Sequence, residues 1–100
     1  MLHVIYTPRF KRDTKKLEKK HVDDGQLREV IRLIMEDSKN SQKELKRRHQ
    51  MHKLKGDWKG SLECHVANVG DWLLVWCVKD GKAYLQRTGT HDEIFKDANS

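Results

Sequence analysis

The dipeptide Asp80-Gly81 lies between two runs of strand-forming residues, and the β-hairpin it predicts constrains the fold of this chain more than any other feature. Asp-Gly suits a two-residue turn because both positions need positive φ, and this turn matches the twist of the flanking strands. Residues 71–78 are apolar on both faces, as in a central strand, and residues 82–88 form their partner. Alternation over residues 61–66 indicates a further, half-buried strand. The C-terminal half therefore predicts a small antiparallel-rich sheet.

The N-terminal half predicts two helices. Thr7 caps the first, which has proline at its first helical position and runs from Pro8 to about Lys20. Asp23 or Asp24 caps the second. Its apolar residues fall at helical spacing: Leu27, Val30, Ile31, Ile34 and Met35. The short link between the helices predicts an antiparallel helical hairpin that lies on one side of the sheet.

The remaining segments complete an α+β fold of the order β-α-α-β-β-β with a short C-terminal helical turn. Residues 2–6 form a short strand. Residues 38–59 are polar and basic with little periodicity, which indicates a loop or a frayed helix. With 100 residues, 36% of them hydrophobic, the chain has room for one core, so residues 1–100 form a single domain.

Basic residues are concentrated in two segments. Residues 9–20 and 43–59 each hold seven Lys and Arg against two acidic residues, and the whole chain carries a formal charge of +6. Clustered basic charge favours a polyanion or an acidic protein as partner. The alternative is an ordinary solvated helix face.

The two cysteines indicate a reducing compartment. Cys64 and Cys77 are too far apart for a metal-binding or redox motif, and the sequence has no secretory signal or membrane-spanning apolar run. We therefore expect a cytoplasmic protein with free thiols and no membrane association. A disulfide between the two is the alternative.

The register of the hairpin brings three polar side chains to one face of the sheet. Counting back from the turn gives three opposed pairs: Lys79 with Lys82, Trp76 with Leu85, and Leu74 with Arg87. If the connection 67–70 has an even number of loop residues, Glu63 lies opposite Leu74 and His65 opposite Trp72. Glu63, His65 and Arg87 then share a face. The other face collects Leu62, Cys64, Leu73, Val75, Cys77 and Tyr84.

An odd connection would turn Glu63 and His65 into the core, which a polar pair without partners resists. The polar face has two further interpretations. It could be an ordinary solvated surface. A metal site built from Glu63, Cys64, His65 and His91 is disfavoured because Cys64 points away from His65 in a regular strand.

A capping box follows the last strand. Thr90 and Glu93 have the Thr-x-x-Glu spacing, so a short helical turn should begin at His91. The positive end of that turn disfavours the imidazolium and leaves a neutral ring that can act as a base. The alternative is a plain C-terminal cap with an incidental surface histidine.

Four segments together resemble one known family. They are HKLKGDWKG at 52–60, ECHV at 63–66, DWLLV at 71–75 and RTGTHDEIF at 87–95. In these segments the chain resembles the YafQ branch of the RelE-like toxins. The resemblance implies a RelE-like fold and a type II toxin that cuts messenger RNA in the ribosomal A site. It also implies an acidic antitoxin of the DinJ or RelB kind, which forms a hetero-oligomer with a toxin that is monomeric when free.

The resemblance also implies residue roles. The catalytic candidates are His52, His65, Asp71, Arg87 and His91, and Phe95 occupies the position of a base-stacking group. Independently of the resemblance, the polar sheet face and the basic segment 43–59 supply the remaining candidates for RNA contact, to messenger or 16S ribosomal RNA: Glu63, Lys46, Arg47, Arg48, Lys55 and Lys59. Phe95 could instead anchor the last turn in the core.

The chemistry of RNA cleavage fits these groups without a metal or cofactor. RNA supplies its own 2′-hydroxyl nucleophile, so the enzyme needs a base, an acid and positive charge at the phosphate. We expect His91 to be the base, His52 or His65 the acid, and Arg87 the clamp on the phosphate. The competing hypotheses are a non-catalytic toxin of the same fold directed at gyrase and a basic RNA-binding module.

Overall fold

The computed structural model describes residues 1–67 and 70–96 and confirms the α+β fold. A five-stranded sheet has the strand order β1-β5-β4-β3-β2, with β1 parallel to β5 and the other neighbours antiparallel. The elements in chain order are β1 His3–Tyr6, α1 Pro8–Lys19, α2 Gly25–Glu36, α3 Lys39–His49, β2 His52–Lys53, η1 Gly56–Trp58, β3 Leu62–His65, β4 Leu73–Lys79, β5 Lys82–Gly89 and η2 Asp92–Lys96.

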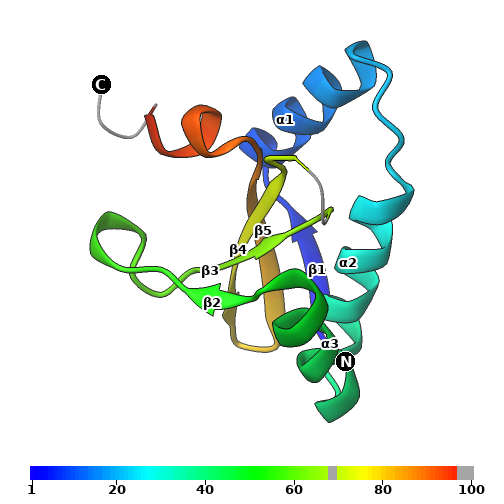
Figure 1. Cartoon of the computed structure of the whole chain (residues 1–100). Helices are drawn as coiled ribbons and strands as arrows, with labels where there is room; N and C mark the ends of the chain where they lie inside the picture. The colour runs from blue at the N-terminus through cyan, green and yellow to red at the C-terminus, as the bar shows by residue number, and fades with distance from the viewer. Residues whose placement is uncertain (68–69, 97–100) are drawn as a thin grey trace.

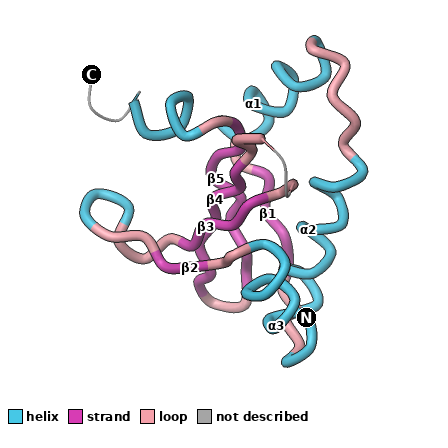
Figure 2. Tube along the Cα trace, in the orientation of Figure 1, coloured by secondary structure: helices cyan, strands magenta, loops and turns pink. Residues whose placement is uncertain are grey.

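The three long helices lie on one side of the sheet, and the short turns η1 and η2 lie on the other (Figures 1 and 2). In the described part of the chain, no helix is long and apolar enough to cross a membrane.

The edge strands of the sheet are β1 and β2. The two strands of the hairpin, β4 and β5, lie between them, with β5 next to β1 and β4 next to β3. Both strands of the predicted hairpin are therefore interior strands, and β4 is the central one.

The start of α1 agrees with the sequence prediction. The Thr7 hydroxyl accepts a hydrogen bond from the Phe10 amide at 3.2 Å, and Pro8 occupies the first helical position. The same hydroxyl donates to the Leu85 carbonyl at 2.6 Å, which fixes the helix start to β5. Because β1 pairs in parallel with β5, α1 is led across the end of the sheet and lies against β5.

The expectation of helices on one side of the sheet is confirmed, and a third helix is added to them. Residues 38–59 are not a loop or frayed helix: they form α3, β2 and η1. A capping box of two serines begins α3, because Ser41 N donates to Ser38 Oγ at 3.0 Å and Ser38 N donates to Ser41 Oγ at 2.9 Å. Leu45 is the one apolar residue that α3 buries, so its amphipathic period is too weak to read.

The hairpin register is correct near the turn and changes at a bulge. Asp80 and Gly81 have φ values of 53° and 75°, as the predicted turn requires. The pairs of Lys79 with Lys82 and of Trp76 with Leu85 are confirmed. Beyond them β5 contains one extra residue, Gln86, so Arg87 pairs with Val75 and the predicted pair with Leu74 is wrong.

The predicted pairing of β3 is also wrong by one residue. Glu63 pairs with Val75 and His65 with Leu73, so the connection has odd parity; within it, residues 68 and 69 lie outside the described part. The two errors compensate because each shifts the register by one position. Glu63 and Arg87 therefore do share a face with Val75 between them, and His65 follows two residues along β3.

The apolar assignment to the two faces is corrected accordingly. The helix face of the sheet holds Cys64, Leu74, Trp76, Ala83 and Leu85, which pack with Phe10, Leu27 and Leu45 of the helices. The opposite face, called the site face below, carries Glu63, Val75 and Arg87. Leu73 and Val75 are buried there against Ile94 of η2, so they do not join the core under the helices as predicted. Cys77 and Tyr84, which pair with each other, alternate with Trp76 and Leu85 and so lie away from the helix face as well.

Candidate active site

Two histidines on the site face are each held by a carboxylate. His52 lies on β2 beside Glu63 of β3, with 3.3 Å between His52 Nε2 and Glu63 Oε1. Glu63 is buried, whereas about half of the His52 side chain is exposed. His52 Nδ1 is 2.9 Å from the Gln50 carbonyl oxygen. Both ring nitrogens thus face acceptors, which suits an imidazolium that donates from both.

His91 is held by Asp71. Its backbone amide donates to Asp71 Oδ2 at 3.0 Å, and its ring Nδ1 is 2.6 Å from Asp71 Oδ1. Because a carboxylate only accepts, Nδ1 carries a proton, and Nε2 is the ring nitrogen that points away from Asp71. Desolvation raises the pKa of the Asp71 carboxyl, but the hydrogen bonds from the amide and ring of His91 lower it by more, so its pKa is below the ordinary value.

The capping box at the start of η2 is confirmed. The Glu93 amide donates to Thr90 Oγ1 at 3.1 Å, and the Thr90 amide donates to Glu93 Oε1 at 2.9 Å. The bond from the Thr90 amide is the largest cause that lowers the pKa of the Glu93 carboxyl. His91 lies at the start of this single turn, as predicted. The carboxylate of Asp71 adds a negative charge beside the ring, which opposes the effect of the turn's dipole.

An aromatic row extends from His91. The ring centroids of His65 and His91 are 6.2 Å apart, and those of His91 and Phe95 are 6.1 Å apart. Trp58 of η1 meets Phe95 edge to face at 5.8 Å. Phe95 also packs against the buried cluster of Leu73, Val75 and Ile94. It thus anchors η2, as one of the two hypotheses for it states, and at the same time lies beside the catalytic candidate His91.

Arg87 occupies a different environment from the one expected for a phosphate clamp. It is buried, and its Nε donates to Asp13 Oδ2 at 2.8 Å. Its Nη2 donates to the Glu93 carbonyl at 3.2 Å and its Nη1 to the Ile94 carbonyl at 3.5 Å. The guanidinium therefore joins α1 to η2 beneath the turn that carries His91.

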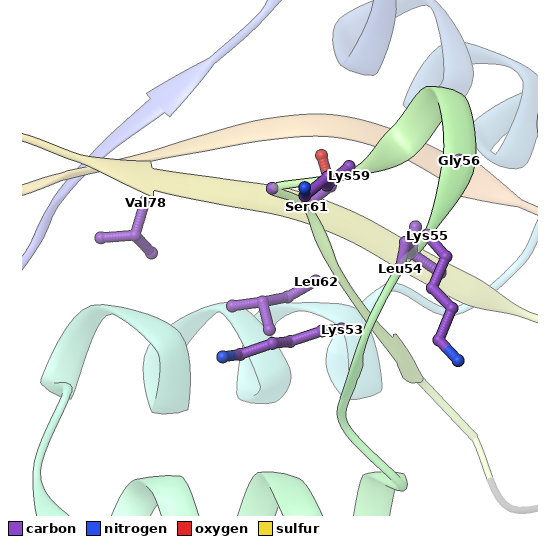
Figure 3. A pocket seen from close by; sticks show the side chains of 9 residues that line it. Lys53, Leu54, Lys55, Gly56, Lys59, Ser61, Leu62 and Val78 are labelled. Carbon is purple, nitrogen blue, oxygen red and sulfur yellow. The ribbon is translucent and has the colours of Figure 1, made fainter.

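The five basic candidates lie on two exposed surfaces. Lys46, Arg47 and Arg48 are exposed on the last turns of α3. Lys55 and Lys59, together with Lys53, line an open groove of about 620 Å³ whose floor includes Leu54, Leu62 and Val78 (Figure 3). Lys53 directly follows His52 on β2, so its side chain points to the opposite face of the sheet, where its partner Leu62 also lies, and the groove opens at this edge of the sheet beside η1. Its lysines suit contact with a phosphate backbone.

Cys64 takes no part in the site. It is fully buried in the core on the helix face, and burial raises the pKa of its thiol far above the ordinary range. Both cysteines are free, so the disulfide alternative is wrong. Among the described residues there is no group of three or more His, Cys, Asp or Glu arranged to hold a metal ion.

Three side chains that support the site were not predicted. Asp13 lies on the stripe of α1 that also holds Phe10 and Leu17, and an acidic residue on a buried face is a signal for a buried cation. His49 Nδ1 is 2.8 Å from the His65 carbonyl oxygen, which ties α3 to β3. Trp58, whose only sequence signal was its place inside the family motif, supports Phe95.

Comparison with known proteins agrees with this architecture. A family model described as "Bacterial toxin of type II toxin-antitoxin system, YafQ" matches residues 2–96. A protein of Escherichia coli K12 named mRNA interferase toxin YafQ is 31% identical over 92 residues, which is 92% of this chain and 94% of the relative. The small α+β fold and this match define the class, a bacterial toxin of a type II toxin-antitoxin system.

Solved structures agree over nearly the whole chain. A copper-bound mutant toxin from Helicobacter pylori has a TM-score of 0.82 at 37% identity and covers 95% of this chain and 100% of its own. YafQ from E. coli BL21(DE3) has a TM-score of 0.81 at 27% identity, covering 95% and 99%, and the toxin of an E. coli DinJ-YafQ complex has 0.78 at 29%, also covering 95% and 99%. The chain belongs to the YafQ toxin family.

Proposed function

We propose that this chain is a ribosome-dependent endoribonuclease that cuts messenger RNA by acid-base catalysis without a metal. Its E. coli relatives are named mRNA interferases. The observation that carries the proposal is the different set of contacts that two histidines make. Nδ1 of His91 lies against Asp71, which leaves Nε2 to take a proton, whereas both ring nitrogens of His52 lie against acceptors, Gln50 and Glu63, which suits a proton donor.

The reaction needs two proton transfers. His91 Nε2 takes the proton of the 2′-hydroxyl while the 2′-oxygen forms a bond to the adjacent phosphorus. The bond from phosphorus to the 5′-oxygen breaks, and that oxygen takes a proton from His52. The products are a 2′,3′-cyclic phosphate and a 5′-hydroxyl end. Each well-placed acid or base contributes about 10²- to 10⁴-fold.

The assignment of the acid to His52 rests on its partners. His65 was the other candidate, and its ring lies beside His91 at 6.2 Å. Next to His91, the proposed proton acceptor, the His65 ring is placed to contact the phosphate or a nucleobase of the RNA. His52 lies on β2 opposite Glu63, two residues along β3 from His65. We therefore place the acid, His52, and the base, His91, on different sides of the scissile phosphate.

For Arg87, the contacts favour a supporting role over direct contact with the phosphate. Its hydrogen bonds run to Asp13 and to carbonyls of η2. The Asp13 carboxylate, 2.8 Å from the guanidinium, offsets its charge, so Arg87 acts on the site through its hydrogen bonds to η2. We assign phosphate contact to the exposed lysines of the groove in Figure 3 and to the basic end of α3.

The basic surface also suits the two partners that we propose, a ribosome and an acidic antitoxin. The DinJ-YafQ complexes show that E. coli YafQ binds an antitoxin. An acidic antitoxin segment on the α3 and η1 surfaces would block RNA by charge and by bulk. Messenger RNA on ribosomes as substrate agrees with the cytoplasmic location expected from the sequence.

The decisive experiment is primer extension on one messenger RNA, with and without translating ribosomes, using the purified toxin. We expect cleavage only in the translated sample, unchanged by EDTA at a concentration that leaves the ribosomes intact. His91→Ala should abolish the cleavage while ribosome binding persists. Growth arrest by the wild type without any cleaved message would instead favour the gyrase-directed alternative, and ribosome binding without cleavage or arrest would favour an RNA-binding module.

A further inference from the structure

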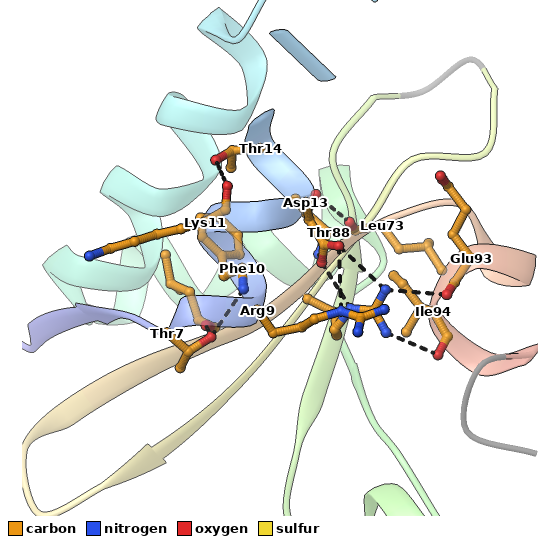
Figure 4. A network of polar contacts seen from close by, with 12 residues as sticks. Thr7, Arg9, Phe10, Lys11, Asp13, Thr14, Leu73, Thr88, Glu93 and Ile94 are labelled. Carbon is orange, nitrogen blue, oxygen red and sulfur yellow. Dashed lines mark hydrogen bonds and ion pairs between the residues drawn. The ribbon is translucent and has the colours of Figure 1, made fainter. Parts of the chain in front are cut away.

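We propose that Asp13 is a positioning residue for RNA cleavage: it holds Arg87, and Arg87 holds the turn η2, which directly follows His91 and carries Phe95. This inference rests on the proposed function. The contacts around Asp13, Thr88, Glu93 and Ile94 form one continuous network (Figure 4). It joins the first helix of the chain to its last turn, across 74 positions of sequence from Asp13 to Arg87.

The Asp13 carboxylate is enclosed by donors. It is 4% exposed, on a helix whose other charged side chains are exposed except for the partly exposed Arg9. Oδ2 accepts from Arg87 Nε at 2.8 Å and from the Thr88 amide at 3.0 Å, and Oδ1 accepts from Arg87 Nη2 at 3.4 Å. Arg9 Nε is a more distant charge at 3.9 Å. A buried carboxylate is stable only with such partners, so its orientation is fixed.

Arg87 connects the fixed Asp13 carboxylate to η2 through hydrogen bonds. Its guanidinium reaches the carbonyls of Glu93 and Ile94 while Asp13 holds its other edge. A single helical turn is too short to be stable by itself, so η2 depends on contacts from outside. Asp71 binds its beginning through His91, and Arg87 binds its middle.

Asp13 is also connected to Asp71, the residue that binds the His91 ring, through Thr88 near the end of β5. The Thr88 amide donates to Asp13, and the Thr88 hydroxyl donates to the Leu73 carbonyl at 2.8 Å and accepts from Trp72 Nε1 at 3.0 Å. Trp72 directly follows Asp71. The Asp13 carboxylate is therefore linked to both structures that orient the His91 ring: to η2 through Arg87, and to the segment of Asp71 through Thr88 and Trp72.

Loss of the carboxylate should act on catalysis more than on binding. Without Asp13 the Arg87 charge is left buried and must find another acceptor, which moves it away from the η2 carbonyls. The basic residues proposed to bind RNA belong to α3 and to the groove beside η1, and none of them is a member of this network. A positioning role thus predicts a loss in kcat with little change in KM.

The test compares Asp13→Asn with Glu18→Gln, the same chemical change at an exposed position of the same helix. We expect Asp13→Asn to lower kcat for cleavage on ribosomes by 10- to 100-fold with KM within twofold, and Glu18→Gln to change neither. Amide hydrogen exchange should become at least tenfold faster at Ile94, whose amide bonds the Thr90 carbonyl, while the β4–β5 hairpin keeps its protection.

A kcat within twofold of the wild type would overturn the proposal, and so would an equal loss of exchange protection in η2 and in the hairpin. If Asp13→Asn does not fold, Arg87→Lys keeps a cation beside Asp13 but lacks the fork that reaches both carbonyls, and it must give the same two effects. The exchange measurement needs no activity. A wild type that does not cleave RNA would thus end the proposed function, whereas unchanged exchange at Ile94 would end the role of Asp13.

Discussion

Replacing Asp71 by Asn should inactivate His91 by placing its ring proton on the wrong nitrogen. The His91 amide needs an acceptor, and in the wild type it has Asp71 Oδ2 at 3.0 Å. In the Asn variant the amide takes the side-chain oxygen, so the side-chain NH₂ faces ring Nδ1. Nδ1 must then accept, which moves the ring proton to Nε2 and removes the lone pair that the base uses.

The size of the effect follows from the bonds involved. Restoring the productive tautomer in the variant requires the amide to give up its acceptor, at a cost of about 1–3 kcal/mol for a hydrogen bond of this kind. Because the Asp71 side chain is 45% exposed, water compensates part of that cost. Each factor of ten in rate corresponds to about 1.4 kcal/mol, so we expect cleavage to slow by about 10- to 100-fold.

The assay is single-turnover cleavage of a messenger RNA on stalled ribosomes, with toxin in excess. Asp80→Asn is the matched control, because it makes the same change at an exposed turn position whose φ of 53° suits asparagine. The control should cleave at the wild-type rate. If Asp71→Asn cleaves within twofold of the wild type, the assignment of His91 as a base oriented by Asp71 is refuted.

Three further predictions concern other parts of the site. His52→Ala should slow cleavage by about 10²-fold or more, measured in the same assay, whereas the exposed His3→Ala should not. The triple alanine variant of the adjacent α3 residues Lys46, Arg47 and Arg48 should bind ribosomes more weakly. Its binding should also depend less steeply on salt concentration, and its melting temperature should change little. The pKa of Glu93 is lowered from 4.5 in the folded state, so its stabilising effect is full above that pH and is lost as the pH falls below it. Glu93→Gln should therefore be less stable than the wild type at pH 7, with the difference narrowing below pH 4 in denaturant titrations.

The sequence predicted what depends on local chemistry. The Asp80-Gly81 turn and the Thr90–Glu93 capping box each require only two residues at fixed spacing, and both have the expected geometry. The start of α1 belongs to the same group. Local signals of this kind hold because the hydrogen bonds they form lie within a few residues of sequence.

Register and long-range pairs could not be read in the same way. The extra residue at Gln86 depends on contacts between strands, including a bond from the Ser61 hydroxyl to the Gln86 side chain at 2.7 Å. The bulge reverses the faces beyond Gln86, but no local pattern marks it, because Arg87 and Thr88 are both polar and do not indicate which of them is turned to the core. The environment of Arg87 escaped prediction for a similar reason, since Asp13 is distant in sequence and stands among the basic residues of α1.

The acidic residues of the site face have to be reconciled with a substrate that is itself an anion. Glu63, Asp71 and Asp13 would repel a phosphate if they stood alone. Each is instead committed to a cationic or donating partner: Glu63 to His52, Asp71 to His91, and Asp13 to Arg87. The pairs reduce the repulsion and set the protonation and orientation of the groups they hold. In a chain with an excess of six positive charges, the surrounding lysines and arginines can then attract RNA, while Glu63 and Asp71 orient the two histidines of the proposed reaction and Asp13 orients Arg87.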